Sequence, residues 1–160
     1  YKKLAEKYSV GLIDLNDTEV SEIENHEFLQ FSNIYYPKIL LESCVISLSI
    51  LKEDEELGMI GSLANMLGAF PAEYYAGFFS LKKNKIRKGP MKYAVHDIVK
   101  CKMPNFAIID ASANGALLAG LPLEMDKLAA KILGKDWKTI PYLRLIEESF
   151  AEKKVVKNKL

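Results

Sequence analysis

Hydrophobic residues along this chain form two patterns, short continuous runs and longer stretches with a helical period. The continuous runs are rich in aliphatic and β-branched residues, a composition that favours strands. They predict strands at residues 10–15, 44–51 and 106–110, a short strand at 117–119 and a further candidate at 28–36. Because Phe106–Ile109 is apolar at every position, we expect this strand to be buried on both faces of its sheet.

The stretches with a helical period predict helices between and after these strands. Near the end of the chain, one helix face is occupied by Leu121, Met125, Leu128, Ala129 and Ile132. Pro122 suits the first turn of that helix, and Gly134 suits a left-handed cap at its end. The same criteria predict helices at residues 59–69, 91–102, 122–133 and 141–151.

Strands and helices alternate along the chain, which is typical of an α/β fold with a mostly parallel or mixed sheet flanked by helices. The length of 160 residues fits a single compact domain, which we assign to residues 1–152, followed by a basic tail at 153–160. The chain begins inside a helical pattern at residues 1–8, so we expect a fragment of a longer chain. A sheet edge or helix face exposed by truncation would then pair with a second copy, giving a homodimer.

Composition narrows the functional classes only slightly. Hydrophobic residues make up 49% of the chain and charged residues 27%, an ordinary composition, and the formal net charge is +1. So small a net charge argues against nucleic acid or a membrane as the main partner, and no apolar run reaches the roughly 18 residues of a membrane span. Cys44 and Cys101 are far apart and fit no metal-ligand pattern, so we expect reduced thiols and a cytoplasmic protein.

Polar residues follow the predicted strands, at the position where open α/β sheets bind ligands. Asp14 lies near the end of the first strand, Lys52 follows the second and Asp110 follows the third. If the strands are parallel, these side chains converge at one edge, next to Asn114 and Gly115 in a loop of small residues. A lysine with two carboxylates can bind a polar metabolite, coordinate a hard metal ion or transfer a proton. Alternatively, Lys52 and Asp110 form a structural ion pair.

Other polar residues have a structural explanation beside the functional one. His96 flanks the apolar stripe of its helix, where a histidine is more often structural than a catalytic base. Asp126 lies near the start of the helix at 122–133, where the helix dipole favours a carboxylate. The basic residues from Lys82 to Lys88 predict an exposed, mobile loop rather than the main site. Nucleic-acid binding through them is disfavoured, because no aromatic platforms for bases are interleaved with them.

Motifs of well-known chemistries are missing from the sequence. It contains no P-loop, no dinucleotide-binding glycine fingerprint, no His-Glu-x-x-His motif and no nucleophile elbow. His26 and His96 are too isolated to form a histidine metal site. We therefore assign no catalytic residue, no metal site and no cofactor from the sequence.

Several blocks of sequence occur in an order that is informative as a set. They are CVISLSILK, SLANMLGAFP, KYAVHDI, FAIID, LLAGLPLEMDKLAAKILGKDW and IPYL. This order resembles the domain of unknown function family 362, from about Ala5 to Phe150. Carried over position by position, the resemblance implies a site that includes Lys52, Asn65, Lys92, His96, Asp110 and Asp126.

The chain departs from that family pattern at three places. Leu-Ser-Ile replaces Asn-x-Pro before Lys52, Asp54 replaces a histidine, and Ala64 replaces the lysine before Asn65. Some relatives resemble iron–sulfur proteins, but this chain has no cysteine cluster, so no cluster is carried over.

The preferred functional interpretation is a domain that binds a small anionic or metal-bound ligand at the carboxyl edge of its sheet, without an assigned reaction. The ligand-binding candidates are Lys52, Asn65, His96, Asp110, Asn114 and Asp126. The alternative is a non-catalytic redox-accessory or interaction module whose partner supplies the chemistry. Nucleic-acid binding through Lys82–Lys88 is the least favoured of the three interpretations.

Overall fold

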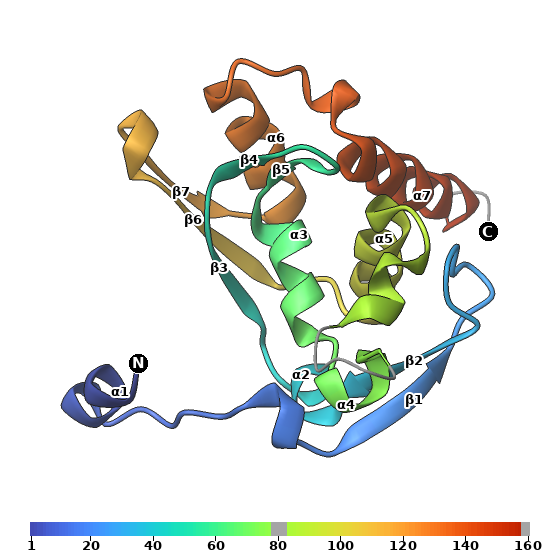
Figure 1. Cartoon of the computed structure of the whole chain (residues 1–160). Helices are drawn as coiled ribbons and strands as arrows, with labels where there is room; N and C mark the ends of the chain where they lie inside the picture. The colour runs from blue at the N-terminus through green and yellow to red at the C-terminus, as the bar shows by residue number, and fades with distance from the viewer. Residues whose placement is uncertain (78–82, 158–160) are drawn as a thin grey trace.

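A three-stranded mixed sheet lies along one side of the molecule (Figure 1). We describe a computed structural model, which covers residues 1–77 and 83–157. Strands β3 (Ile46–Ile50) and β6 (Phe106–Ala111) run parallel, and β7 (Ala116–Gly120) is antiparallel to β6. The strands predicted at 44–51, 106–110 and 117–119 are therefore confirmed, with the first two adjacent in one sheet.

Two hairpins and a set of helices complete the fold. The hairpins pair β1 (Val20–Glu24) with β2 (Asn33–Pro37) and β4 (Lys52–Asp54) with β5 (Gly58–Ile60). The helices are α1 (Lys2–Tyr8), α2 (Lys38–Glu42), α3 (Ser62–Asn65), α4 (Ala72–Tyr75), α5 (Met91–Cys101), α6 (Pro122–Ile132) and α7 (Pro141–Lys157). Short 3-10 turns are η1 (Leu15–Asp17), η2 (Met66–Ala69), η3 (Asn84–Lys88), η4 (Ser112–Asn114) and η5 (Trp137–Thr139).

The helices predicted at 91–102, 122–133 and 141–151 correspond to α5, α6 and α7. Helix α7 continues to Lys157, and residues 158–160 at the end of the predicted tail lie outside the described residues. Among the described residues, no helix combines the length and apolar character that a bilayer crossing requires. The structure as a whole is a mixed α/β domain.

The sheet is covered on one face only, which corrects the expectation that its strands are buried on both faces. Helices α3 and α6 pack against the face that carries Ala107 and Ile109, and both side chains are fully buried. On the other face, Ile50 is 71% exposed and Phe106 is 39% exposed. Successive side chains of a strand point to opposite faces, so one layer of helices buries every second residue. In Figure 1 these helices lie to the right of the sheet.

The predicted strand at 10–15 is wrong. Residues 10–14 form no ladder, and the chain turns at η1, where the Asp14 side chain accepts a hydrogen bond from the Asn16 N–H at 2.9 Å. An apolar run becomes a strand only when a neighbouring strand pairs with it, and no strand lies beside this one in the described structure. Asp14 is consequently not part of the sheet edge.

Two further predictions need correction at their boundaries. The helix predicted at 59–69 begins instead as strand β5, because Met59 pairs with Glu53 across the β4–β5 hairpin, and only residues 62–69 are helical. The strand predicted at 28–36 starts at Asn33. The preceding backbone N–H groups, from residues 29–31, donate to a side chain on α5 instead of to a strand.

Candidate functional site

The carboxyl edge of the sheet brings together part of the predicted constellation. The register pairs Ile50 with Asp110, so Lys52 follows β3 near the end of β6. Hydrogen bonds from Ser112, including its N–H at 2.9 Å, lower the pKa of Asp110 below its usual value. Asn114 is exposed in the turn that follows. Lys52 and Asp110 form no ion pair within the described chain, so the structural pair considered above is not made.

Asp126 is fully buried and holds the start of α3 rather than facing solvent. Its carboxylate accepts hydrogen bonds from the Ser62 N–H at 2.7 Å, the Ser62 hydroxyl at 2.6 Å, the Leu63 N–H at 3.1 Å and the Tyr142 hydroxyl at 3.1 Å. Burial raises the pKa of Asp126, against these hydrogen bonds, which lower it. A Cβ at Gly61 would lie 2.8 Å from this carboxylate, so glycine is needed there. Asp126 thus caps helix α3, and it also lies in the first half of its own helix, α6, where the helix dipole favours a carboxylate.

His96 is also buried, and its partner is the adjacent aspartate. The imidazole Nδ1 lies 2.8 Å from Oδ1 of Asp97, which is itself fully buried. The Asp97 carboxylate also accepts the backbone N–H groups of Leu29 at 2.8 Å, Gln30 at 2.8 Å and Phe31 at 3.1 Å. Helix α5 therefore fixes the loop at residues 29–31. The sequence signal for this role is an acidic residue within the apolar stretch of a predicted helix, and the sequence candidates did not include it.

Asn65 lies at the end of α3 and is exposed. Its side-chain amide donates to the Ser47 hydroxyl at 3.2 Å and to the Leu48 carbonyl at 3.1 Å, both on β3. The sequence candidates thus occupy separate places in the molecule. Lys52, Asp110 and Asn114 belong to the end of the sheet, Asn65 ties α3 to β3, and His96 and Asp126 are buried in hydrogen-bond networks.

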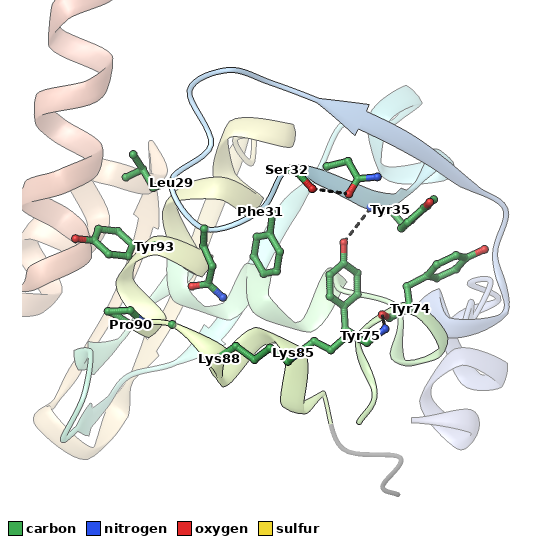
Figure 2. Close-up of a pocket in the computed structure, with 13 residues that line it drawn as sticks. Leu29, Phe31, Ser32, Tyr35, Tyr74, Tyr75, Lys85, Lys88, Pro90 and Tyr93 are labelled. Atoms are coloured by element: carbon green, nitrogen blue, oxygen red, sulfur yellow. Dashed lines mark hydrogen bonds between the residues drawn. The ribbon is translucent and has the colours of Figure 1, made fainter. Parts of the chain in front are cut away.

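A groove of about 630 Å³ lies elsewhere, and Figure 2 shows the side chains around it. It is formed by the loop before β2, by β2 itself, by α4 and η3, and by the start of α5. We call it the tyrosine groove. Its lining consists of Leu29, Gln30, Phe31, Ser32, Asn33, Tyr35, Tyr74, Tyr75, Lys85, Lys88, Gly89, Pro90 and Tyr93. Aromatic rings and two lysines dominate this lining, and no carboxylate of the described residues belongs to it.

The aromatic rings of the groove are ordered by contacts with one another. Tyr35 and Tyr74 stack with ring centroids 4.4 Å apart and an interplanar angle of 22°. Phe31 meets Tyr75 edge to face, with centroids 5.8 Å apart. The Tyr75 hydroxyl accepts the Tyr35 N–H at 2.9 Å, and burial raises the pKa of Tyr75. The wall is therefore an aromatic surface whose rings hold one another in place.

The opposite side of the groove is basic. Lys85 and Lys88 are exposed on η3, and the Lys85 ammonium donates to the Tyr74 carbonyl at 2.8 Å, as Figure 2 shows. Neither ammonium lies within ion-pair distance of a carboxylate in the described part of the chain. By contrast, Arg87 of the same turn lies 3.7 Å from Glu56. Much of the predicted basic loop is thus a short 3-10 turn, and Lys82 lies outside the described residues.

The loop above the lysines is held in place by Gln30. Its Nε2 donates to the Ile86 carbonyl at 2.7 Å, and its Oε1 is buried with no hydrogen-bond partner among the described residues. A Cβ at Gly89 would approach that oxygen to 3.0 Å, so glycine leaves room for the amide. The groove is therefore closed on one side by a side chain that links two distant segments.

Fold and groove together define a mixed α/β domain with an aromatic and basic groove away from the end of its sheet. A family model with the description "Domain of unknown function (DUF362)" matches residues 1–130, and the chain belongs to this family. That description assigns no activity. No curated protein matches the chain, and no solved structure matches it.

Proposed function

We propose that this protein binds a small anionic ligand carrying a flat ring, and that the tyrosine groove is the site. The observation that supports the proposal is a hollow lined by Phe31, four tyrosines and two lysines that form no ion pair within the described residues, with no described carboxylate. A groove of this composition attracts negative charge because no acidic side chain competes for the ammonium groups.

The two parts of the ligand would have separate subsites. Phosphate or carboxylate oxygens accept charge-assisted hydrogen bonds from the Lys85 and Lys88 ammonium groups. The flat ring lies on the aromatic wall, where Tyr35 and Tyr74 are half-buried and already stacked. Stacking of one ring on an aromatic side chain contributes roughly 1–3 kcal/mol, which is enough to favour a ring-bearing anion over inorganic phosphate.

The lining of the groove supports ligand binding without catalysis. Within the described residues, the groove contains no carboxylate, imidazole or thiol, so its candidate acid–base groups are limited to tyrosines and lysines. This favours the non-catalytic alternative from the sequence over an enzyme, and it moves the site from the sheet edge to the groove. In the groove, Lys85 and Lys88 of the basic stretch lie beside aromatic side chains, an arrangement that sequence order alone did not show.

A titration with matched variants tests the proposal. The probes are phenyl phosphate, adenosine monophosphate and inorganic phosphate, and the measurement is calorimetry together with tyrosine fluorescence. We expect the ring-bearing anions to bind more tightly than phosphate. The double change Lys85→Gln and Lys88→Gln should weaken them by at least about tenfold, since two charged hydrogen bonds are lost. Tyr74→Leu should weaken them but leave phosphate binding unchanged.

Lys52→Gln is the matched control, because it removes an exposed lysine at the sheet edge. If this variant lost binding and the groove variants kept it, the ligand site would be the edge with Lys52 and Asp110, and the proposal would be wrong. A single-stranded oligonucleotide serves as a further probe. If the oligonucleotide bound much more tightly than the mononucleotide, the groove would be part of a nucleic-acid-binding surface, and the proposal of a small ligand would be wrong.

We also propose that the protein works in the cytoplasm. Cys44 is exposed and Cys101 is partly buried, and both are free thiols. An exposed free thiol persists in a reducing compartment and is oxidised in most others. Fractionation of cells that produce the tagged full-length protein tests this assignment.

A further inference from the structure

The uncovered face of the three-stranded sheet exposes several large apolar side chains side by side, which the surface of a soluble domain rarely does. Ile46, Leu48 and Ile50 on β3 are 56%, 68% and 71% exposed, and Leu117 on β7 is 70% exposed. The pairing register places Phe106 on the same face, opposite Ile46. We call these five residues the open sheet face. Their exposed apolar area is on the order of 500 Å², a size at which a contiguous patch is often an interaction surface.

The inward-facing side chains of β3 are polar, in contrast to the apolar side chains on its outer face. Ser47 and Ser49 point inward and are almost fully buried. The Ser47 hydroxyl donates to the Ser62 carbonyl at 2.7 Å, and the Ser49 hydroxyl has no partner among the described residues. A strand with serines in the core and large aliphatic residues outside is patterned for a partner on its outer side, because solvent exposure alone favours the reverse order.

A second exposed apolar element lies at the other end of the chain. Val10, Leu12 and Ile13 form an extended arm, each more than half exposed, and nothing lies within 4 Å of the position of a Cβ at Gly11. The base of this arm is fixed, because the Asn16 side chain accepts the Ala72 N–H at 2.8 Å. In Figure 1 the arm and helix α1 extend away from the rest of the molecule.

We propose that the open sheet face binds the N-terminal arm of a second copy of this chain, in a two-fold symmetric exchange of arms. Residues 10–14 and strand β3 each span five residues, about 16 Å when extended, so the arm matches the strand in length. Each copy carries both the apolar face and the apolar arm, so one two-fold contact covers both surfaces on both copies.

The apolar area favours this occupant. The face alone is below the roughly 800 Å² per partner of a stable interface, and adding the arm and the exposed Leu4 and Tyr8 of α1 brings the total to about 1,000 Å². Helix α1 carries Lys2, Lys3 and Lys7, whereas the carboxyl end of the face carries both Asp110 and Lys52. Charge therefore does not set the direction of the arm, and the proposal rests on the apolar area.

The first test measures mass against concentration for the full chain, by sedimentation velocity and light scattering. We expect a dimer that dissociates on dilution. Leu48→Lys on the face and Leu12→Lys on the arm should each raise the dissociation constant by at least about tenfold, because each places a charge in an apolar contact. Both positions are exposed, so circular dichroism should show unchanged folding. Leu128→Lys, at an exposed leucine of α6, is the matched control and should leave the dimer intact.

The second test identifies the occupant by cross-linking in a Cys44→Ser background. One copy carries Leu12→Cys and the other Leu48→Cys, and the two are mixed under oxidising conditions. A disulfide between the two chains confirms the exchange. A chain that is monomeric at all concentrations, or a disulfide that forms only inside a chain carrying both cysteines, overturns the proposal. So does a dimer that the face variant dissociates and the arm variant does not, since two sheets would then pack face to face.

Discussion

Two buried carboxylates, Asp97 on α5 and Asp126 on α6, perform the same physical task in different regions of the molecule. Each is fully buried, and each accepts several backbone N–H groups from a segment distant in sequence. Asp126 holds the start of α3 inside the core, whereas Asp97 holds the loop at 29–31 that lines the tyrosine groove. Both carboxylates bind backbone N–H groups in the same way. Their roles differ because the backbone bound by Asp126 lies in the core, whereas the backbone bound by Asp97 lines the groove.

The comparison separates stability from binding. The Asp126 network joins α3, α6 and α7 through Ser62, Leu63 and Tyr142, so its loss affects packing between helices. The Asp97 network joins α5 to a surface loop, so its loss affects the shape of the groove wall. Four predictions test this separation, in order of decreasing expected effect.

Asp126→Ala should produce the largest loss of stability. It leaves two backbone N–H groups and two hydroxyl groups without their acceptor in the core, which we expect to lower the free energy of unfolding by about 3 kcal/mol. Urea denaturation monitored by circular dichroism measures this value. Asp110→Ala removes an exposed carboxylate instead and should change stability by less than about 0.5 kcal/mol. Equal losses of stability in the two variants would contradict the proposed role of Asp126 in holding α3.

Asp97→Ala should lower stability less and affect ligand binding more. We expect a loss of about 2 kcal/mol in the free energy of unfolding, because three backbone N–H groups are freed but lie near the surface, where water replaces the carboxylate. Binding of phenyl phosphate should weaken by at least about tenfold as the loop at 29–31 loses its position. Asp97→Asn, which retains one acceptor oxygen, should fall between wild type and Asp97→Ala in both measurements. Unchanged binding in both variants would show that the loop does not depend on Asp97.

Tyr75→Phe tests the groove wall with a smaller change. The substitution removes the hydroxyl that accepts the Tyr35 N–H and leaves the ring in place. We expect a loss of about 1 kcal/mol in the free energy of unfolding, with the edge-to-face contact to Phe31 preserved. Tyr93→Phe removes a hydroxyl for which the structure shows no hydrogen-bond partner among the described residues, and it should have no measurable effect on stability.

The titration of Cys101 should show the smallest effect. Burial, with a further contribution from the charge of Asp97, raises the pKa of Cys101 to about 12. A folded-state pKa above the unfolded one gives stability that is complete below the unfolded value, and it is lost as the pH rises toward about 12. Asp97→Asn should lower the pKa of Cys101, and Asp126→Asn should leave it unchanged. Thiol absorbance against pH in a Cys44→Ser background measures both, and a shift caused by Asp126→Asn would contradict the expected separation.

Several parts of the fold follow from local sequence alone. The runs at 44–51 and 106–110 are strands because β-branched and aliphatic residues suit an extended backbone in a sheet. The helix at 122–132 follows from its apolar period and from Pro122 in its first turn. These signals act over a few residues, and in these segments the long-range pairing and packing agree with them. The order of sequence blocks likewise suffices to identify the family.

Tertiary structure decided the rest. Residues 10–14 have the composition of a strand but have no partner in the described structure, and a strand exists only as part of a pair. The tyrosine groove joins residues from 29–35, 74–75 and 85–93, so the lysines and their aromatic neighbours meet only after folding. Asp97 and Asp126 are each one acidic residue on an amphipathic helix in the sequence. Their different roles arise because long-range packing, which local spacing does not encode, sets which backbone groups each carboxylate reaches.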